Sequence, residues 1–87
     1  MHEMAIAMAL IDQVEQAARE QKAQAIASIT VAVGRLSGVD PDALRAVFEL
    51  AAEETLAAGA QLEVEVLEGR ELYIKSMDVD VEESKDV

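Results

Sequence analysis

Residues 1–15, MHEMAIAMALIDQVE, contain the pattern around which the rest of the chain is organised. Apolar residues recur at steps of three and four in this stretch and just beyond it: Met4, Ala7, Met8, Ile11, Val14 and Ala18. Such spacing places side chains on one face of a helix. We therefore expect a helix from about Glu3 to Lys22 that packs this face on the core, with both methionines as core residues rather than thioether ligands of Cu(I).

The only histidine of the chain, His2, stands next to the terminal amine. A bulky second residue disfavours removal of Met1, so an amine, a backbone amide and an imidazole can close around one ion. Ni(II) and Cu(II) favour such planar nitrogen ligands. The pattern is compatible with a metal site at Met1, His2 and Glu3. Two simpler roles stay open, a terminus without function for His2 and a favourable charge at the helix start for Glu3.

Composition limits the classes of function open to this chain. Eighty-seven residues with 52% hydrophobic and 29% charged side chains indicate one small globular domain. Seven basic against 18 acidic residues give a net charge of −11, which disfavours nucleic acids and anionic membranes. The absence of cysteine excludes disulfides and thiolate zinc sites. With no apolar run near the ~20 residues that span a bilayer and no signal-peptide pattern, we expect a cytoplasmic protein.

The later elements follow from alternation and capping signals. Alternating apolar residues predict a strand over Ile26–Val33. Asp40 and Pro41 are typical of a helix start, and the helix should run to roughly Glu54. Two further strands give the order α-β-α-β-β. We therefore predict an α+β fold in which two helices pack on one face of a three-stranded sheet.

The two last strands, expected at 62–66 and from 72 onward, are predicted to pair as a hairpin. In this register apolar residues oppose apolar ones and a glutamate opposes a lysine. The predicted pairs are Val66–Leu72, Val64–Ile74, Glu65–Tyr73 and Glu63–Lys75. The apolar parity changes after Ile74, which indicates a bulge near Ser76. The largely acidic residues 81–87 should form a solvated tail.

Four segments of this chain resemble one protein family. They are Met1–Met4, Val33–Arg45 (VGRLSGVDPDALR), Ala58–Val64 (AGAQLEV) and Gly69–Met77 (GRELYIKSM). In this order they are similar to HypA, the nickel-incorporation protein of hydrogenase maturation. The resemblance implies that Met1, His2 and Glu3 bind Ni(II). It also implies delivery to the maturation GTPase HypB and then to the large subunit of [NiFe]-hydrogenase or, in some relatives, to urease.

One departure from the family pattern is large. Family members carry two CxxC pairs that form a zinc ribbon between the last two segments, and this chain has no cysteine. The resemblance therefore implies a nickel-binding domain over residues 1–80, without zinc, whose zinc domain is absent between about 66 and 69. The alternative is an interaction domain that keeps the family's docking surfaces but delivers no metal. Homodimer formation or strand exchange stays open, because a three-stranded sheet has exposed edges.

An enzyme is not expected. The chain has no thiol nucleophile, no serine or threonine with a histidine placed to activate it, and no pair of carboxylates in an evident pocket. The acidic residues near the expected hairpin tip could bind a hard cation, but their spacing does not force them together, and a solvated face is the preferred interpretation. They are Glu63, Glu65, Glu68 and Glu71.

Overall fold

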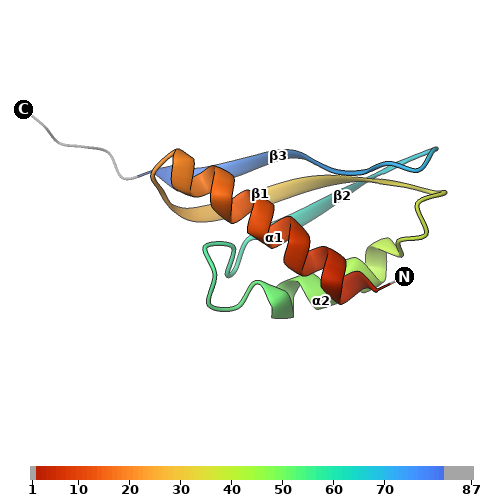
Figure 1. Ribbon diagram of the computed structural model, residues 1–87, viewed down its shortest axis with the longest axis horizontal. Helices are drawn as coiled ribbons and strands as arrows, with labels where there is room; N and C mark the ends of the chain where they lie inside the picture. The colour runs from red at the N-terminus through yellow and green to blue at the C-terminus, as the bar shows by residue number, and fades with distance from the viewer. Residues whose placement is uncertain (1, 82–87) are drawn as a thin grey trace, which may run out of the picture.

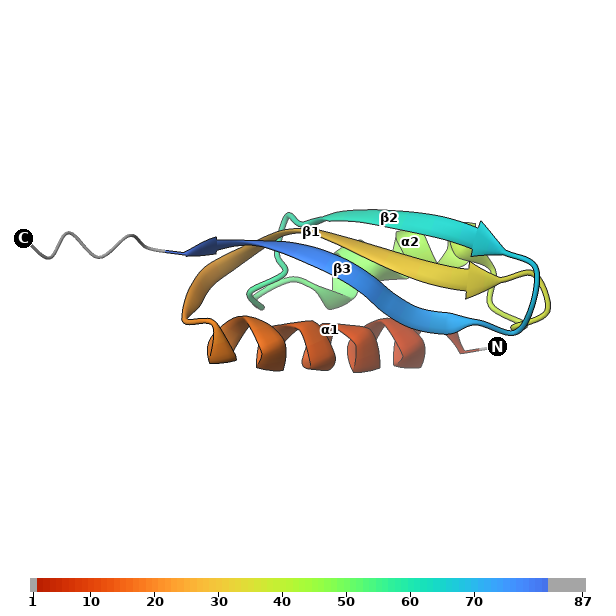
Figure 2. The ribbon, with the colours of Figure 1, turned by 90° about the horizontal axis from the view of Figure 1, so that it is seen from above.

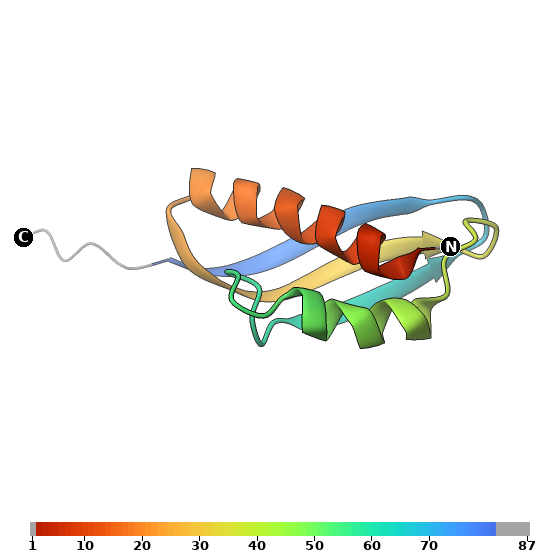
Figure 3. The ribbon, with the colours of Figure 1, turned by 60° about the horizontal axis from the view of Figure 1, so that its bottom comes forward.

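Two helices lie on one face of a three-stranded sheet (Figure 1). The computed structural model describes residues 2–81. The elements are α1 (Glu3–Glu20), β1 (Ala23–Gly34), α2 (Pro41–Ala51), β2 (Gln61–Leu67) and β3 (Leu72–Val81). Their order and the placement of both helices on the same face confirm the predicted α+β fold (Figure 3). Of the predicted tail, only Val81 is described, and it ends β3; residues 82–87 lie outside the described part.

Strand β1 occupies the centre of the sheet, which has the order β2-β1-β3 (Figure 2). It runs parallel to β2 and antiparallel to β3. Ile29, Val31 and Val33 face the helices and are at most 1% exposed, and Ala32 on the opposite face is also fully buried. A strand that is apolar on one face and small on the other fits between two neighbours, so the end of β1 is buried without interruption from Val31 to Gly34.

The predicted hairpin is wrong, because β2 and β3 pair with β1 and not with each other. Val66 and Leu72, predicted to face each other, instead both pair with Val33 from opposite sides. The prediction assumed that strands joined by a short link are neighbours. A link of four residues spans up to roughly 13 Å, whereas two strand spacings amount to roughly 10 Å. Residues 68–71 can therefore cross over the end of β1.

The link 68–71 crosses close to the end of β1, and each of the two segments has a glycine at this point, Gly69 and Gly34. The Gly34 N–H donates to the Glu71 carbonyl at 2.8 Å, and the Leu36 N–H donates to the Gly69 carbonyl at 2.8 Å. A Cβ atom on Gly34 would overlap the carbonyl of Gly69. Only a residue without a side chain allows the link to approach β1 so closely.

The predicted bulge in the last strand is confirmed, although its partner is β1. The register shifts where Thr30 pairs with Ser76 and Val31 pairs with Ile74, which leaves Lys75 as the extra residue. An extra residue moves all later side chains to the opposite face. For this reason Ile74 and Met77 both pack against the core despite their different parity.

Helix α1 packs a narrower stripe than predicted. Its buried residues are Ala7, Leu10, Ile11, Val14 and Ala18. Met4 is half-buried, but Met8 is 56% exposed, so its assignment to the core is wrong. At 100° per residue, Met8 lies roughly 100° from Ala7, which is one of the fully buried residues. The helix ends at Glu20, and Lys22 takes a positive φ of 58° in the turn to β1.

Helix α2 begins as predicted and contributes two of the buried core residues. The Asp40 carboxylate accepts hydrogen bonds from the amides of Asp42 at 2.9 Å and Ala43 at 3.4 Å. Leu44 and Phe48 are buried, and Val47 and Ala51 pack against the core as expected. The helix ends at Ala51 rather than near Glu54, because Glu54 itself has a positive φ of 63°.

Candidate metal centre

His2 lies at the exposed start of α1. It occupies the N-cap position, and its side chain makes no capping hydrogen bond. Its carbonyl accepts from the Ile6 N–H at 3.2 Å. The imidazole is therefore not committed to stabilising the helix. Met1, the predicted amine ligand, lies outside the described residues.

The main chain around His2 also provides suitable nitrogen atoms. The first amides of an α-helix have no partner within the helix, because the carbonyls they would need precede the helix start. The Ile6 N–H is the one that donates to the carbonyl of His2, so the amides of His2 and Glu3 are not used in that turn. A planar metal ion needs such uncommitted backbone nitrogens together with an imidazole.

The Glu3 carboxylate connects the starts of the two helices. Its Oε2 atom accepts a hydrogen bond from the Asp40 N–H at 3.3 Å. Asp40 in turn caps α2 with its own carboxylate. Because the positive ends of two helix dipoles meet here, carboxylates are favoured at this end of the molecule. The third predicted ligand thus has a contact that contributes to structure.

Sequence reasoning did not find this contact. Asp40 was recognised as a helix cap, but nothing in the sequence relates it to Glu3, which lies 37 residues earlier. The start of α1 lies at the same end of the molecule as the loop before α2 and the link between β2 and β3 (Figures 1 and 3). The Glu3–Asp40 contact can be predicted only when this arrangement of the elements is known.

Three of the four acidic residues considered for a hard cation have other partners. Glu65 contacts the ammonium group of Lys75 at 2.6 Å, and Glu68 contacts the guanidinium of Arg35 at 3.1 Å. Glu71 accepts from the Gly69 N–H at 2.9 Å. Within residues 2–81, no three His, Cys, Asp or Glu side chains come close enough together to hold a metal ion. A site at His2 would therefore have to use main-chain nitrogens.

Neither helix in the described part of the chain is long and apolar enough to cross a membrane.

Comparison with known proteins identifies similar sequences. The family model described as "Hydrogenase/urease nickel incorporation, metallochaperone, hypA" matches residues 1–70. The hydrogenase maturation factor HypA of Chlorobium limicola is 45% identical over 65 residues, which cover 75% of this chain and 56% of the relative. That of Streptomyces avermitilis is 49% identical over 71 residues, covering 80% and 54%. This chain therefore spans little more than half the length of these two relatives.

A longer match and a solved structure extend the comparison. The maturation factor HypA of Aquifex aeolicus is 37% identical over 86 residues, which cover 99% of this chain and 72% of the relative. The solution structure of the Ni metallochaperone HypA from Helicobacter pylori matches with a TM-score of 0.84 at 20% identity. The match covers 94% of this chain and 100% of that one. At this identity the likeness shows a common fold.

Proposed function

Because this chain belongs to the HypA family, we propose that it is a nickel-binding module that carries Ni(II) at its amino terminus for [NiFe]-hydrogenase maturation. The relatives are named hydrogenase maturation factors, and the family description names nickel incorporation. The ion is the cargo of such a protein. The ligands in this proposal are the amine of Met1, the imidazole and amide of His2, and the amide of Glu3.

The exposed, uncapped position of His2 is the observation that carries this proposal. A histidine at the N-cap with no hydrogen bond to its helix leaves the imidazole free to turn toward the terminal amine. The unpaired amides of the first turn lie in the same short segment. The donor set is rich in nitrogen, as a square-planar ion requires.

Glu3 contributes differently in this proposal. Its carboxylate holds the start of α1 against the start of α2 through the Asp40 N–H, and its amide is the part that binds metal. Replacing the carboxylate would then loosen the terminus without removing a ligand. Glu3→Gln should keep most nickel affinity, because the amide oxygen still accepts a hydrogen bond.

The proposed partners are the maturation GTPase HypB and the hydrogenase large subunit, in the cytoplasm. The module comprises residues 1–80, and the zinc ribbon that the family resemblance implies is absent between about 66 and 69, beside the link that crosses β1. The absence of cysteine from the sequence supports a second candidate. In that case the chain is an interaction domain that keeps the docking surfaces and delivers no metal.

Calorimetric titration with Ni(II) tests the proposal on three proteins: the native chain, His2→Ala, and a chain whose terminal amine is acetylated. We expect one site in the native protein and a loss of at least about tenfold in affinity in both altered proteins. Acetylation removes the amine from the set of ligands and keeps His2 at the second position. Affinity should also fall as pH falls, because binding displaces protons from its ligands.

The melting temperature serves as the control, since His2 is exposed and its replacement should leave the fold intact. Equal nickel affinity in all three proteins would contradict a site at the terminus and favour the interaction domain.

A further inference from the structure

Strand β2 has one free edge, and its main-chain polarity can be assigned. The Leu67 carbonyl accepts from the Arg35 N–H at 2.8 Å, so Leu67 directs its main chain toward β1 and its extension. Successive residues of a strand point their N–H and C=O groups to opposite sides. Leu62, Val64 and Val66 therefore direct theirs away from β1, toward the side where the described sheet has no further strand. These groups can pair with an added strand.

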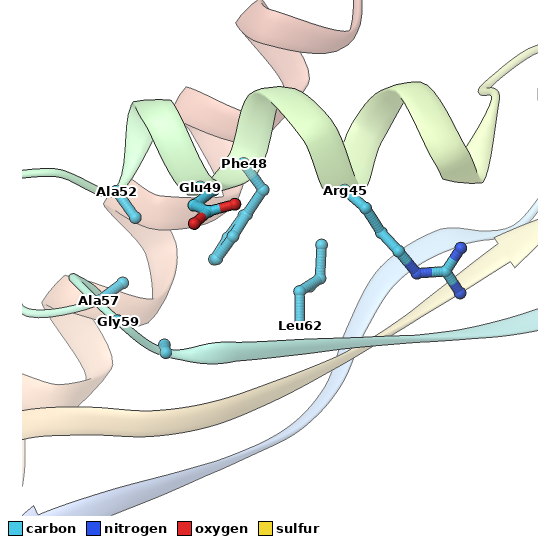
Figure 4. Close-up of a pocket in the computed structure, with 8 residues that line it drawn as sticks. Arg45, Phe48, Glu49, Ala52, Ala57, Gly59 and Leu62 are labelled. Atoms are coloured by element: carbon cyan, nitrogen blue, oxygen red, sulfur yellow. The ribbon is translucent and has the colours of Figure 1, made fainter.

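Two hollows lie on the side of β2 that faces α2 and the loop before it, and together they are called the groove here. At one end, a hollow of about 200 Å³ lies against Phe48, Ala57 and Leu62. Figure 4 shows Leu62 pointing from β2 toward α2, with Phe48 and Arg45 descending on either side of the opening. At the other end, a hollow of about 330 Å³ is lined by Val39, Val66 and their neighbours. Val66 is 44% exposed, so the groove keeps apolar surface in contact with water.

The charges around the groove are mostly acidic. On the opposite face of β2, Glu63 and Glu65 alternate with the residues that face the groove, and Glu63 is exposed. Glu49 lines the groove from α2. Two arginines line the groove: Arg45 is paired with Asp42 at 3.0 Å, and Arg35 is paired with Glu68 at 3.1 Å. In a strand placed beside β2, alternate side chains would point to opposite faces of the sheet. Those on the helix-covered face would meet the apolar hollows, and those on the open face would meet carboxylates.

The other edge strand is less suited to accept a partner. Pairing of β3 with β1 is interrupted by register shifts, one of them at Lys75. Bulges twist an edge away from regular pairing and are a common protection of exposed strands. By contrast, β2 pairs with β1 in an unbroken register from Gln61 to Leu67.

We propose that β2 and α2 form a docking groove for an extended basic segment of a partner protein, which adds to the sheet beside β2. Its apolar side chains, at every second position, enter the two hollows. Lysine or arginine at the positions between them pairs with Glu63, which is exposed, whereas Glu65 already contacts Lys75. A second copy of this chain is a poorer occupant. Two β2 strands side by side would bring the same glutamates together, and like charges on paired strands repel.

A labelled seven-residue peptide of alternating lysine and valine serves as the probe, in a fluorescence anisotropy titration. A lysine–serine peptide and a glutamate–valine peptide are its controls. We expect the lysine–valine peptide to bind at least about tenfold more tightly than either control, because only this peptide offers both features. Equal binding of the lysine–serine peptide would overturn the proposal in favour of nonspecific attraction to an acidic protein.

Two matched substitutions locate the site. Val66→Asp places a charge in the groove, and Leu72→Asp makes the same change on the far side of their common neighbour Val33. Both residues are partly exposed, at 44% and 37%, so both variants should fold. We expect about tenfold weaker peptide binding from Val66→Asp and less than about a twofold change from Leu72→Asp. Equal losses would overturn the proposal.

Charge and main-chain pairing are tested separately. Glu63→Lys should weaken peptide binding about threefold, as expected for a cross-strand charge pair, whereas Asp80→Lys on β3 should leave it unchanged. Hydrogen exchange at the amides of Val64 and Val66 should slow on binding. Protection at β3 instead, or protection that grows with protein concentration alone, would overturn the proposal, the latter in favour of a second copy. His2→Ala should bind the peptide normally, because this inference does not rest on nickel binding.

Discussion

The two faces of the sheet differ in what holds them together. On the helix-covered face, Ile29, Val31 and Val33 are buried beneath α1 and α2. On the open face, the alternate residues of β1 are Ser28, Thr30 and Ala32. Their partners on β2 and β3 are polar or charged, apart from the aromatic Tyr73. One face is an aliphatic core, and the other is a polar surface held by hydrogen bonds and ion pairs.

The contrast indicates where the stability of the protein resides. Contacts on the open face include the Ser28–Asp78 hydrogen bond at 2.7 Å and the Lys75–Glu65 pair at 2.6 Å. Exposed pairs of this kind contribute little to stability, because water and salt screen them. Burial of a large aliphatic or aromatic side chain contributes about 1.5–3 kcal/mol. The covered face therefore determines whether the chain folds, and the open face can vary its charges.

The largest expected effect is on the covered face. Phe48 is 2% exposed and is the only phenylalanine in the chain. Phe48→Ala should lower the free energy of unfolding by about 3–5 kcal/mol, because it removes buried contacts and leaves a cavity. Urea denaturation measures this loss. Tyr73→Ala, on the open face and 48% exposed, is the matched aromatic control and should cost about 1 kcal/mol or less. Equal losses would remove the distinction between the faces.

An intermediate effect is expected where the link from β2 to β3 crosses β1. Gly34→Ala should cost about 1–3 kcal/mol, since its Cβ would overlap the Gly69 carbonyl and the backbone would have to move. Gly69→Ala is the control, because its Cβ would meet only the flexible side chain of Glu71. Thermal melting of both variants measures the difference. A Gly69 variant as unstable as the Gly34 variant would argue against a specific backbone clash.

The smallest effect belongs to an ion pair of the open face. The hydrogen bond to Glu65 and the negative charge of that carboxylate raise the pKa of Lys75 above its ordinary value of 10.5. A raised pKa in the folded state means that the pair stabilises the protein below pH 10.5 and that this contribution is lost as pH rises through the folded-state value.

Comparison with Lys75→Met isolates this contribution. The native protein should be slightly more stable at neutral pH, and the two stability curves should converge in alkaline solution. Denaturant unfolding across this range measures the difference. Parallel curves would show that the Lys75–Glu65 contact adds no net stability, and the open face would then contribute even less than proposed.

The sequence was sufficient to predict the helices and strands, but not the order of the strands in the sheet. Alternation in Leu62–Val66 predicts a strand, and Asp40 with Pro41 predicts a helix start, because these signals are local. Whether β2 pairs with β3 or with β1 depends on which strand is buried on both sides. In β1, Ala32 is buried on the face opposite the helices. An alanine is common at both buried and exposed positions, so the sequence does not reveal that this face of β1 is buried.

The candidate site shows the same division between local and distant information. The placement of His2 beside the terminal amine can be read from two consecutive residues. The Glu3–Asp40 contact and the groove beside β2 depend on tertiary structure. The prediction that Met8 is buried failed for a simpler reason. Met8 lies at the edge of the apolar face of α1, and the orientation of α1 on the sheet determines how much of that face is buried.

The central position of β1 has a consequence for the growing chain on the ribosome. Both neighbours of β1 follow it in the sequence, so this apolar strand leaves the ribosome before either of its edges can be paired. Its last partner, β3, is also the last described element to be made. An unpaired apolar strand invites association between nascent chains. Helix α1 precedes β1 in the sequence, so it is available to cover one face of β1 until the other strands arrive.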